Sequence, residues 1–314
     1  MLDFLHDRRD FKELLAVVAE QRGIDPILVE KDYWIMHCLW GLKAAGFHFE
    51  LKGGTSLSKG FGVIHRFSED IDIRIDPPLA MNVKVGRNHD KHVHVESRRT
   101  YYEWLSKKIS IPGISAVERD TAFDEEKMRS AGIRLRYSNR AAQQTGIKDG
   151  ILLELGFDDT APNRQVTISS WAYETAVSAG VTAYDNRAVN IPCYLPTYTF
   201  VEKLQTISTK YRLRKISRSF PRNFMRHYYD LYCLLDLQEI QSFIGTSEYQ
   251  SRKVRRFRGS DELNISKNPA FFLNDPQEKA LFESEYRKTS ALYYSGQPDL
   301  EKILTRFGQF IFKM

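Results

Sequence analysis

The feature that most constrains this 314-residue chain is a pair of short motifs with fifteen residues between them. The first is Gly53–Gly54, at the end of an apolar stretch, and the second is Asp70–Ile75, in which three isoleucines alternate with two aspartates and an arginine. Because the side chains of a β-strand point alternately to its two faces, the isoleucines share one face and the aspartates share the other. The second motif therefore predicts an amphipathic strand that presents two carboxylates together.

Two carboxylates one strand repeat apart repel each other unless a cation lies between them. Mg²⁺ prefers carboxylate, phosphate and water oxygens, so Asp70 and Asp72 predict a site for Mg²⁺ or Mn²⁺. The alternative is the solvated side of an edge strand, which is the better interpretation of an isolated Asp-x-Asp pattern. The neighbouring glycine motif favours the metal site.

The residues around the glycine motif predict a strand over 47–52, a glycine turn and a helix from Thr55, an order that binds anions. Glycines adopt positive φ and let a phosphate approach the main chain, while Thr55 or Ser56 caps the helix or bonds a phosphate oxygen. Lys59, one turn after Thr55, either reaches the same anion or points to water. The predicted phosphate-binding residues are Gly53, Gly54, Thr55, Ser56 and Lys59.

The run from Leu51 to Ile75, LKGGTSLSKGFGVIHRFSEDIDIRI, resembles the nucleotidyltransferase motif of the AbiEii/AbiGii toxin family and is similar to MenT-type toxins. These toxins are a branch of the DNA polymerase β-like nucleotidyltransferases. The upstream run Glu30–Tyr33 and the downstream run Glu202–Leu204 also fit the family. The run Arg226–Tyr232 resembles a later family motif, with His-Tyr-Tyr where Arg-Asp is more usual. The resemblance covers residues from about 30 to 235.

The resemblance implies a metal-dependent nucleotidyltransferase with an NTP as substrate. Asp70 and Asp72 are then its catalytic metal ligands. Lys203 contacts the nucleotide phosphates, and Asp230 acts in catalysis or orients Lys203. In related systems a serine near the acidic motif is modified to silence the enzyme, and Ser68 is the candidate here, since a phosphate would add negative charge beside the metal ligands.

A third carboxylate in sites of this superfamily usually comes from a neighbouring strand. The run 151–157 alternates as a strand does, with apolar residues at the odd positions and Glu154 facing the other way. Glu154 is therefore the candidate third metal ligand. As an alternative, it is a lone exposed residue on a sheet face.

The resemblance also implies an RNA acceptor, in particular the 3′ end of tRNA, whose extension would block translation, and a separate antitoxin protein. A nucleotidyltransferase that modifies a protein or a small molecule is an alternative, and so is a non-catalytic RNA-binding or interaction module. The intact set of motif residues argues against the last alternative. That set is Gly53, Gly54, Asp70, Asp72 and Lys203.

The charge of the chain, formally +6 with a pI near 9.0, favours a polyanionic partner. Seven basic residues lie within 210–226 and five within 251–258. These two basic tracts either grip an RNA backbone or form a solvated helical face. Aromatic residues among them either stack on unpaired bases or point inward; they are Tyr211, Phe220, Phe224 and Phe257.

The fold class predicted for the chain is α+β, a polymerase β-like nucleotidyltransferase domain with a mixed sheet flanked by helices, followed by a helical domain. Pro192 and Pro196 mark the expected border, which gives domains over 1–195 and 196–314 with the catalytic cleft between them. Helices are predicted over 11–22, 26–45, 95–109, 198–211 and 222–237, and strands over 47–52, 70–75, 133–137, 151–157 and 165–170.

The remaining polar and sulfur-containing residues carry weaker signals. The three cysteines are far apart and read as reduced packing residues. His89, His92 and His94 either bind zinc or belong to a mobile, basic, substrate-facing loop. No apolar run approaches the length of a membrane span, and the N-terminus is too acidic for a secretion signal, which predicts a cytoplasmic protein without a membrane partner.

Overall fold

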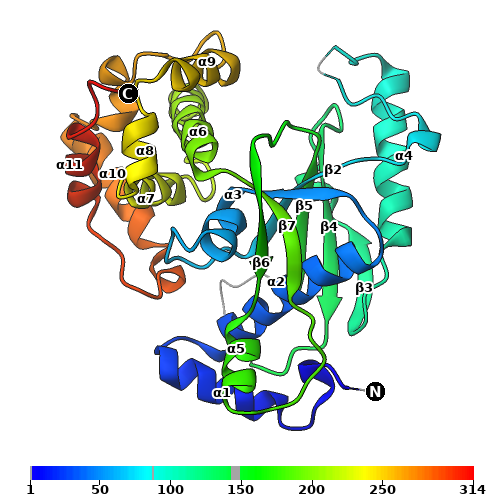
Figure 1. Cartoon of the computed structure of the whole chain (residues 1–314). Helices are drawn as coiled ribbons and strands as arrows, with labels where there is room; N and C mark the ends of the chain where they lie inside the picture. Colours follow the sequence, from blue (N-terminus) through cyan, green and yellow to red (C-terminus); the bar gives the residue numbers. More distant parts are fainter. Residues whose placement is uncertain (1, 87, 143–148) are drawn as a thin grey trace. The chain divides into compact units, whose positions relative to one another are not determined.

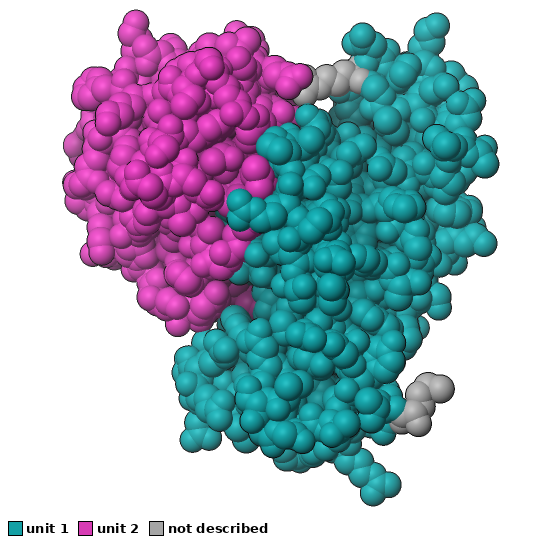
Figure 2. All heavy atoms as spheres, in the orientation of Figure 1, with its two compact units in different colours: residues 1–60, 68–194 teal, residues 61–67, 195–314 magenta. Residues whose placement is uncertain are grey.

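The computed structural model describes residues 2–86, 88–142 and 149–314. Its chain divides into two compact units, coloured separately in Figure 2. Unit 1 comprises Met1–Gly60 and Ser68–Tyr194, and unit 2 comprises Phe61–Phe67 and Leu195–Met314. Part of the segment between the glycine motif and the acidic motif, Phe61–Phe67, thus belongs to unit 2, although both motifs belong to unit 1.

Unit 1 is built on a mixed sheet, in which seven strands of the described chain run in the order β3-β4-β5-β2-β1-β7-β6 (Figure 1). The central strand β2 pairs antiparallel with β1 and parallel with β5, and β1 pairs parallel with β7. This sheet with its helices confirms the predicted α+β class. The strands are β1 Phe49–Lys52, β2 Asp70–Ile75, β3 Ile114–Arg119, β4 Ser130–Tyr137, β5 Ile151–Gly156, β6 Asn163–Ile168 and β7 Ala188–Tyr194.

The helices of unit 1 include a long buried helix, α2, that contacts β5 and β7 on the sheet and also α1 and α5. Its start follows the predicted signal, because the side chain of Asp25 accepts a hydrogen bond from the Ile27 amide at 2.9 Å and Pro26 occupies the first turn. The helices are α1 Phe11–Arg22, α2 Pro26–Ala44, α3 Gly53–Thr55, α4 His92–Lys108 and α5 Trp171–Ser178.

Unit 2 is helical in its described part. Its core is aromatic: Tyr228 lies within 6.0 Å of Phe224, Phe282 and Phe307, measured between ring centroids. The hydroxyl of Tyr228, which is fully buried, donates to the carbonyl of Ala270 at 2.7 Å. The helices are α6 Pro196–Ser217, α7 Met225–Leu234, α8 Gln238–Phe243, α9 Ser247–Arg256, α10 Pro276–Arg287 and α11 Leu300–Gly308.

The structure differs from the predicted elements mainly in strands that lack clear alternation. Strand β7 was not predicted; it runs through Pro192 and pairs on both sides, with β1 and with β6. A proline in a strand loses only one donor, and the rest of β7 retains its ladder bonds. Helix α4 begins at His92 instead of Val95, so His92 and His94 are helical and do not lie in a loop.

Candidate active site

The acidic strand β2 presents its two aspartates as predicted. Ile71, Ile73 and Ile75 are at most 1% exposed, whereas Asp70 and Asp72 are half-buried on the other face. Burial of the isoleucines fixes which face the carboxylates occupy, because a shift of one residue would turn every side chain over. The two carboxylates therefore share a partly solvated face of the sheet.

The glycine turn lies directly beside Asp72. Lys52, the last residue of β1, is the register partner of Asp72 in β2, and Gly53 follows with φ +70°. A Cβ atom added to Gly53 would overlap the Asp72 carboxylate. Gly53 is thus required for two reasons, since its backbone is left-handed and the carboxylate fills the space of a side chain. Gly54 continues into the short helix α3.

The two hydroxyl residues after the glycines do not cap a helix, which corrects the first of their predicted roles. Helix α3 begins earlier than predicted, at Gly53, and continues as a π-helical turn over Ser56–Gly60. The hydroxyl of Thr55 donates to the carbonyl of Asp70, and the hydroxyl of Ser56 donates to the carbonyl of Tyr194 at 3.3 Å. Both side chains are fully buried. They fasten the turn to the ends of β2 and β7.

Lys59 has a carboxylate partner inside unit 1 and does not simply point to water. Its ammonium group forms an ion pair with Asp32 of α2, with 2.6 Å between Nζ and Oδ1. The other oxygen of Asp32 accepts a hydrogen bond from the Trp171 amide at 2.8 Å, at the start of α5. Asp32 is only 1% exposed, so this carboxylate connects the π-helical turn, α2 and α5 inside unit 1.

Glu154 lies on the strand next to the acidic strand. In the parallel pair of β2 and β5, Glu154 is the register partner of Asp72, and Leu152 is the partner of Asp70. The three carboxylates of Asp70, Asp72 and Glu154 therefore come from neighbouring positions on two strands. Within the described ranges, no three or more His, Cys, Asp or Glu side chains converge closely enough to form a metal-binding group.

The two predicted residues of unit 2 meet in a buried ion cluster. The Lys203 ammonium lies 2.7 Å from Asp230 Oδ2, and Arg66 contacts both oxygens of the same carboxylate at 2.7 and 2.8 Å. Asp230 is fully buried, and the side chains of Lys203 and Arg66 are 8% and 4% exposed. Arg66 is the member of this cluster that the sequence analysis did not single out. The only sign of it in the sequence was its place within the motif run from Leu51 to Ile75.

In this cluster, burial disfavours the charged form of Asp230 and Arg66, whereas the opposite charge of the partner favours it. Burial acts to raise the pKa of Asp230, but the charges and hydrogen bonds of Arg66 and Lys203 outweigh it, and the pKa lies below its ordinary value. Burial acts to lower the pKa of Arg66, and the Asp230 carboxylate more than reverses that effect. Asp230 and Arg66 are therefore both charged near neutral pH.

His227 borders the cluster on α7. Its Nδ1 atom lies 3.5 Å from the Lys203 ammonium, and its Nε2 atom lies 3.2 Å from the Lys210 ammonium. The pKa of His227 lies well below its ordinary value because the ring is desolvated and because the charges of Lys210 and Lys203 oppose protonation. The imidazole is therefore neutral near pH 7.

The model of the family described as "Nucleotidyl transferase AbiEii toxin, Type IV TA system" matches residues 38–309. The chain belongs to the AbiEii family. The match spans both units, which confirms the resemblance seen in the motifs and identifies the protein as a nucleotidyltransferase of a toxin–antitoxin family. The family designation also implies an antitoxin partner.

Other comparisons add little to the AbiEii assignment. No curated protein matches the chain. A crystal structure of an antigenic nucleotidyltransferase-like protein from Paracoccidioides brasiliensis is similar with 13% identity and a TM-score of 0.32, over 88% of this chain and 93% of that chain.

The basic tracts of this AbiEii protein contain both packed and exposed residues. Tyr211 is 4% exposed and Phe224 is 1% exposed. Both side chains therefore point inward, and neither can stack on an RNA base. Phe220 packs against Phe282 with 5.1 Å between ring centroids. Several arginines of the tracts form ion pairs within unit 2; these pairs are Arg212–Asp261, Arg214–Glu278, Arg252–Glu202 and Arg256–Glu202.

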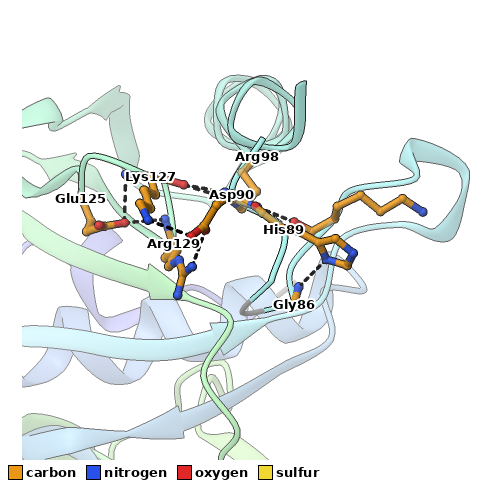
Figure 3. A network of polar contacts seen from close by, with 8 residues as sticks. Gly86, His89, Asp90, Arg98, Glu125, Lys127 and Arg129 are labelled. Carbon is orange, nitrogen blue, oxygen red and sulfur yellow. Dashed lines mark hydrogen bonds and ion pairs between the residues drawn. The ribbon is translucent and has the colours of Figure 1, made fainter. Parts of the chain in front are cut away.

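The loop that precedes α4 is held by a polar network (Figure 3). Asp90 forms ion pairs with Lys127, at 2.7 Å, and with Arg129, and hydrogen bonds from these groups lower the pKa of Asp90 to about 2. Arg98, which is 1% exposed, donates to the carbonyl of Lys127 at 2.8 Å and to that of His89 at 3.1 Å. These bonds hold the loop against α4 and the residues before β4.

The histidines of this region have other partners than zinc. His89 Nδ1 accepts a hydrogen bond from the Gly86 amide at 3.1 Å, and its ring contacts that of His94 edge-on. The side chain of His92 is 90% exposed. The three rings therefore do not form a zinc site.

Two further expectations concern cysteines and membranes. Cys38, Cys193 and Cys233 are free thiols, and the first two are buried, as packing residues are. None of the described helices combines the length and the apolar character that spanning a bilayer requires.

Proposed function

We propose that this AbiEii protein transfers NMP from an NTP to an RNA acceptor, the 3′ end of tRNA in particular, and blocks translation as a result. The observation that supports the proposal is the contact of the glycine turn with Asp72, because a glycine turn next to a pair of carboxylates suits a phosphate with its metal ion. The transferase activity follows from the family, whereas the acceptor and its consequence are the proposed part.

The metal ligands in this proposal are Asp70 and Asp72, with Glu154 as the third carboxylate. Their hard oxygens suit Mg²⁺ or Mn²⁺, and the absence of a side chain at Gly53 lets the Asp72 carboxylate lie directly against the glycine turn. When bound, the metal would neutralise charge on the phosphoryl oxygens and orient the triphosphate. The backbone of Gly53, Gly54, Thr55 and Ser56 would receive the phosphates, and Lys59 would support this turn through Asp32.

The acceptor hydroxyl oxygen forms a bond to the α-phosphorus, the bond to pyrophosphate breaks, and the hydroxyl proton leaves to a carboxylate or to solvent. Lys203 supplies positive charge for the phosphoryl oxygens, and Asp230 holds the Lys203 ammonium in position through their 2.7 Å ion pair. Arg66 contacts both oxygens of the same carboxylate and so fixes the orientation of Asp230 beside Lys203.

Ser68 is proposed as the regulatory position. It is partly exposed and lies two residues before Asp70, at the point where the chain enters unit 1. A phosphate on Ser68 would place about two negative charges close to the carboxylates and would compete with the triphosphate for cations.

The decisive experiment combines purified protein, Mg²⁺, each of the four labelled NTPs in turn, and total cellular RNA. Label should enter RNA with at least one NTP, and tRNA should be the main labelled species. If label enters protein or a small molecule instead, the RNA acceptor is wrong. If no NTP is consumed in the presence of any acceptor, the transfer proposal itself is wrong.

A further inference from the structure

We infer that unit 2 carries a dedicated surface for the sugar–phosphate backbone of RNA, which we call the outer basic face and define as Lys215, Arg218, Arg255 and Arg258. The inference deepens the proposed function, because it assigns the binding of the RNA acceptor to a particular surface. It rests on how charge is divided between the units and on which basic residues the fold already uses.

The charge of the chain is unequally divided. Unit 2 contains 21 lysines and arginines against 13 aspartates and glutamates, a formal charge of +8, whereas unit 1 contains 25 against 27, a formal charge of −2. The positive charge of the whole chain therefore comes from the helical unit. A polyanion approaching the protein is attracted to that unit.

Some basic residues of unit 2 already form ion pairs or hydrogen bonds within the fold. Glu202 pairs with Arg252 and Arg256, and the partly buried Glu278 pairs with Arg214. The ammonium of Lys253, which is 4% exposed, donates to the carbonyl of Met314. These inner residues attach α9 and α10 to their neighbours and are not available to a ligand.

The members of the outer basic face differ from these inner residues in exposure. Arg218, Arg255 and Arg258 are exposed, and the side chain of Lys215 remains 54% exposed beside Glu278. Lys215 and Arg218 follow Arg212 at helical spacings of three residues at the end of α6. Arg255 and Arg258 lie at the end of α9 and just beyond it.

A single buried carboxylate joins the two tracts, which occupy residues 210–226 and 251–258 of the sequence. The Asp261 side chain accepts a hydrogen bond from Arg212 Nε at 2.8 Å and another from the Arg258 amide at 3.4 Å. The hydroxyl of Thr209 donates to the same carboxylate at 2.5 Å. Asp261 therefore holds the ends of α6 and α9 together, and their exposed basic residues form one surface.

The chemistry of this surface favours phosphates over a protein ligand. Exposed lysine and arginine groups recognise phosphate oxygens without reading a sequence, which suits the backbone of an RNA. Exposed apolar residues also occur here, Ile216 at 71% and Val254 at 67% exposure, and a protein partner would depend on them instead.

Binding of a short fluorescein-labelled RNA, followed by anisotropy without any NTP, tests this inference independently of transfer. Lys215→Glu with Arg218→Glu, and separately Arg255→Glu with Arg258→Glu, should each weaken binding. All four changes together should weaken it roughly 100-fold at physiological salt and reduce the slope of log K against log salt by about 2 to 3, because each phosphate contact contributes ~0.7 to that slope for a single strand.

The charge-matched control is Arg287→Glu with Lys302→Glu, which lie on α10 and α11 and change the net charge by the same amount as either pair. Equal weakening by the control pair would overturn the inference, as would unchanged binding in the quadruple variant or no RNA binding by the wild-type protein. Ile216→Ser with Val254→Ser should leave RNA affinity within about twofold; a loss as large as that of the charge variants would also overturn it. Circular dichroism verifies that each variant is folded. If RNA binds through this face but receives no label, the proposed transfer fails while the surface stands.

Discussion

The acidic strand of unit 1 and the ion cluster of unit 2 arrange their charged groups by different physical means. In unit 1, β-sheet register brings Asp72 next to Lys52 and Glu154, and the partly solvated carboxylates are placed by backbone hydrogen bonds. In unit 2, Asp230 is fully buried and its position depends on the cations of Arg66 and Lys203. Neutralising a carboxylate of the first kind should change stability little, whereas removing one of the second kind should be destabilising, because it leaves buried cations without their counter-ion.

The largest effect should come from Asp72→Asn. Removing this charge should reduce nucleotide transfer by roughly 1000-fold, as expected for the loss of a main electrostatic group at a transferring phosphate. Because Asp72 is half-buried on the sheet, the urea midpoint of unfolding should stay near that of the wild type. The matched control is Asp76→Asn just after β2, which should retain activity; equal loss in both variants would remove Asp72 from the site.

Asp230→Ala, unlike Asp72→Asn, should mainly lower the stability of the protein. It leaves two buried cations without their counter-ion, so the free energy of unfolding should fall by about 3–5 kcal/mol. All four tryptophans lie in unit 1, so far-UV circular dichroism should detect the loss of unit 2 before tryptophan fluorescence changes. Asp236→Ala removes an exposed ion pair with Arg306 and should cost at most about 1 kcal/mol. A stable Asp230→Ala protein would show that the cluster is not structural.

The pH dependence of unit 1 should be set by buried neutral histidines. His37 donates from Nε2 to the Pro112 carbonyl and accepts from Asn186 at Nδ1, both at 2.8 Å, and burial lowers its pKa to about 4. The unfolded chain binds a proton near its ordinary pKa of 6.5, so stability should fall as the pH drops from about 6.5 to about 4.

The contribution of His37 to this fall is roughly 3 kcal/mol, from a shift of about two and a half pKa units. Tryptophan fluorescence during urea unfolding measures it, since Trp34 contacts His37 with 5.4 Å between ring centroids. His37→Gln should flatten the pH dependence, while the exposed control His48→Gln should leave it unchanged. An unaltered profile in His37→Gln would contradict the prediction.

The smallest effect should come from Gly53→Ala. The left-handed backbone and the overlap with the Asp72 carboxylate should together cost about 1–3 kcal/mol, seen mainly as reduced transfer because Asp72 is displaced. Gly46→Ala is a matched control, since Gly46 also has a positive φ, +79°, but no atom within 4 Å of an added Cβ. If both variants transfer nucleotide equally well, contact between the turn and Asp72 has no role in the reaction.

Local patterns predicted the elements of the fold whose signals lie within a few residues. The alternation of Asp70–Ile75 predicted both the strand and its buried face, and Asp25 with Pro26 predicted the start of α2. Strand β7 was not predicted, because Pro192 argues against a strand and only pairing with β1 and β6 overcomes that preference.

The candidate site, like the fold, was predictable only where its signals lie within a few residues of each other. The strand that carries Glu154 was predicted because its residues alternate. The hydrogen bonds of Thr55 and Ser56 were not predicted, because the carbonyls that accept them belong to β2 and β7, outside the local motif. Lys59 has its partner on α2, and the partner of Arg66 is 164 residues away. No local spacing predicts such pairs.

The sequence by itself determined the acidic strand, the glycine turn, the family and the two basic tracts, because periodicity and composition are properties of neighbouring residues. The tertiary structure decided which basic residues are used in packing and which remain on the surface, and it decided that Arg66 joins Lys203 and Asp230 in unit 2. The reason is that burying a charge is favourable only when a partner of opposite charge is brought to it, and only the folded chain brings distant residues together.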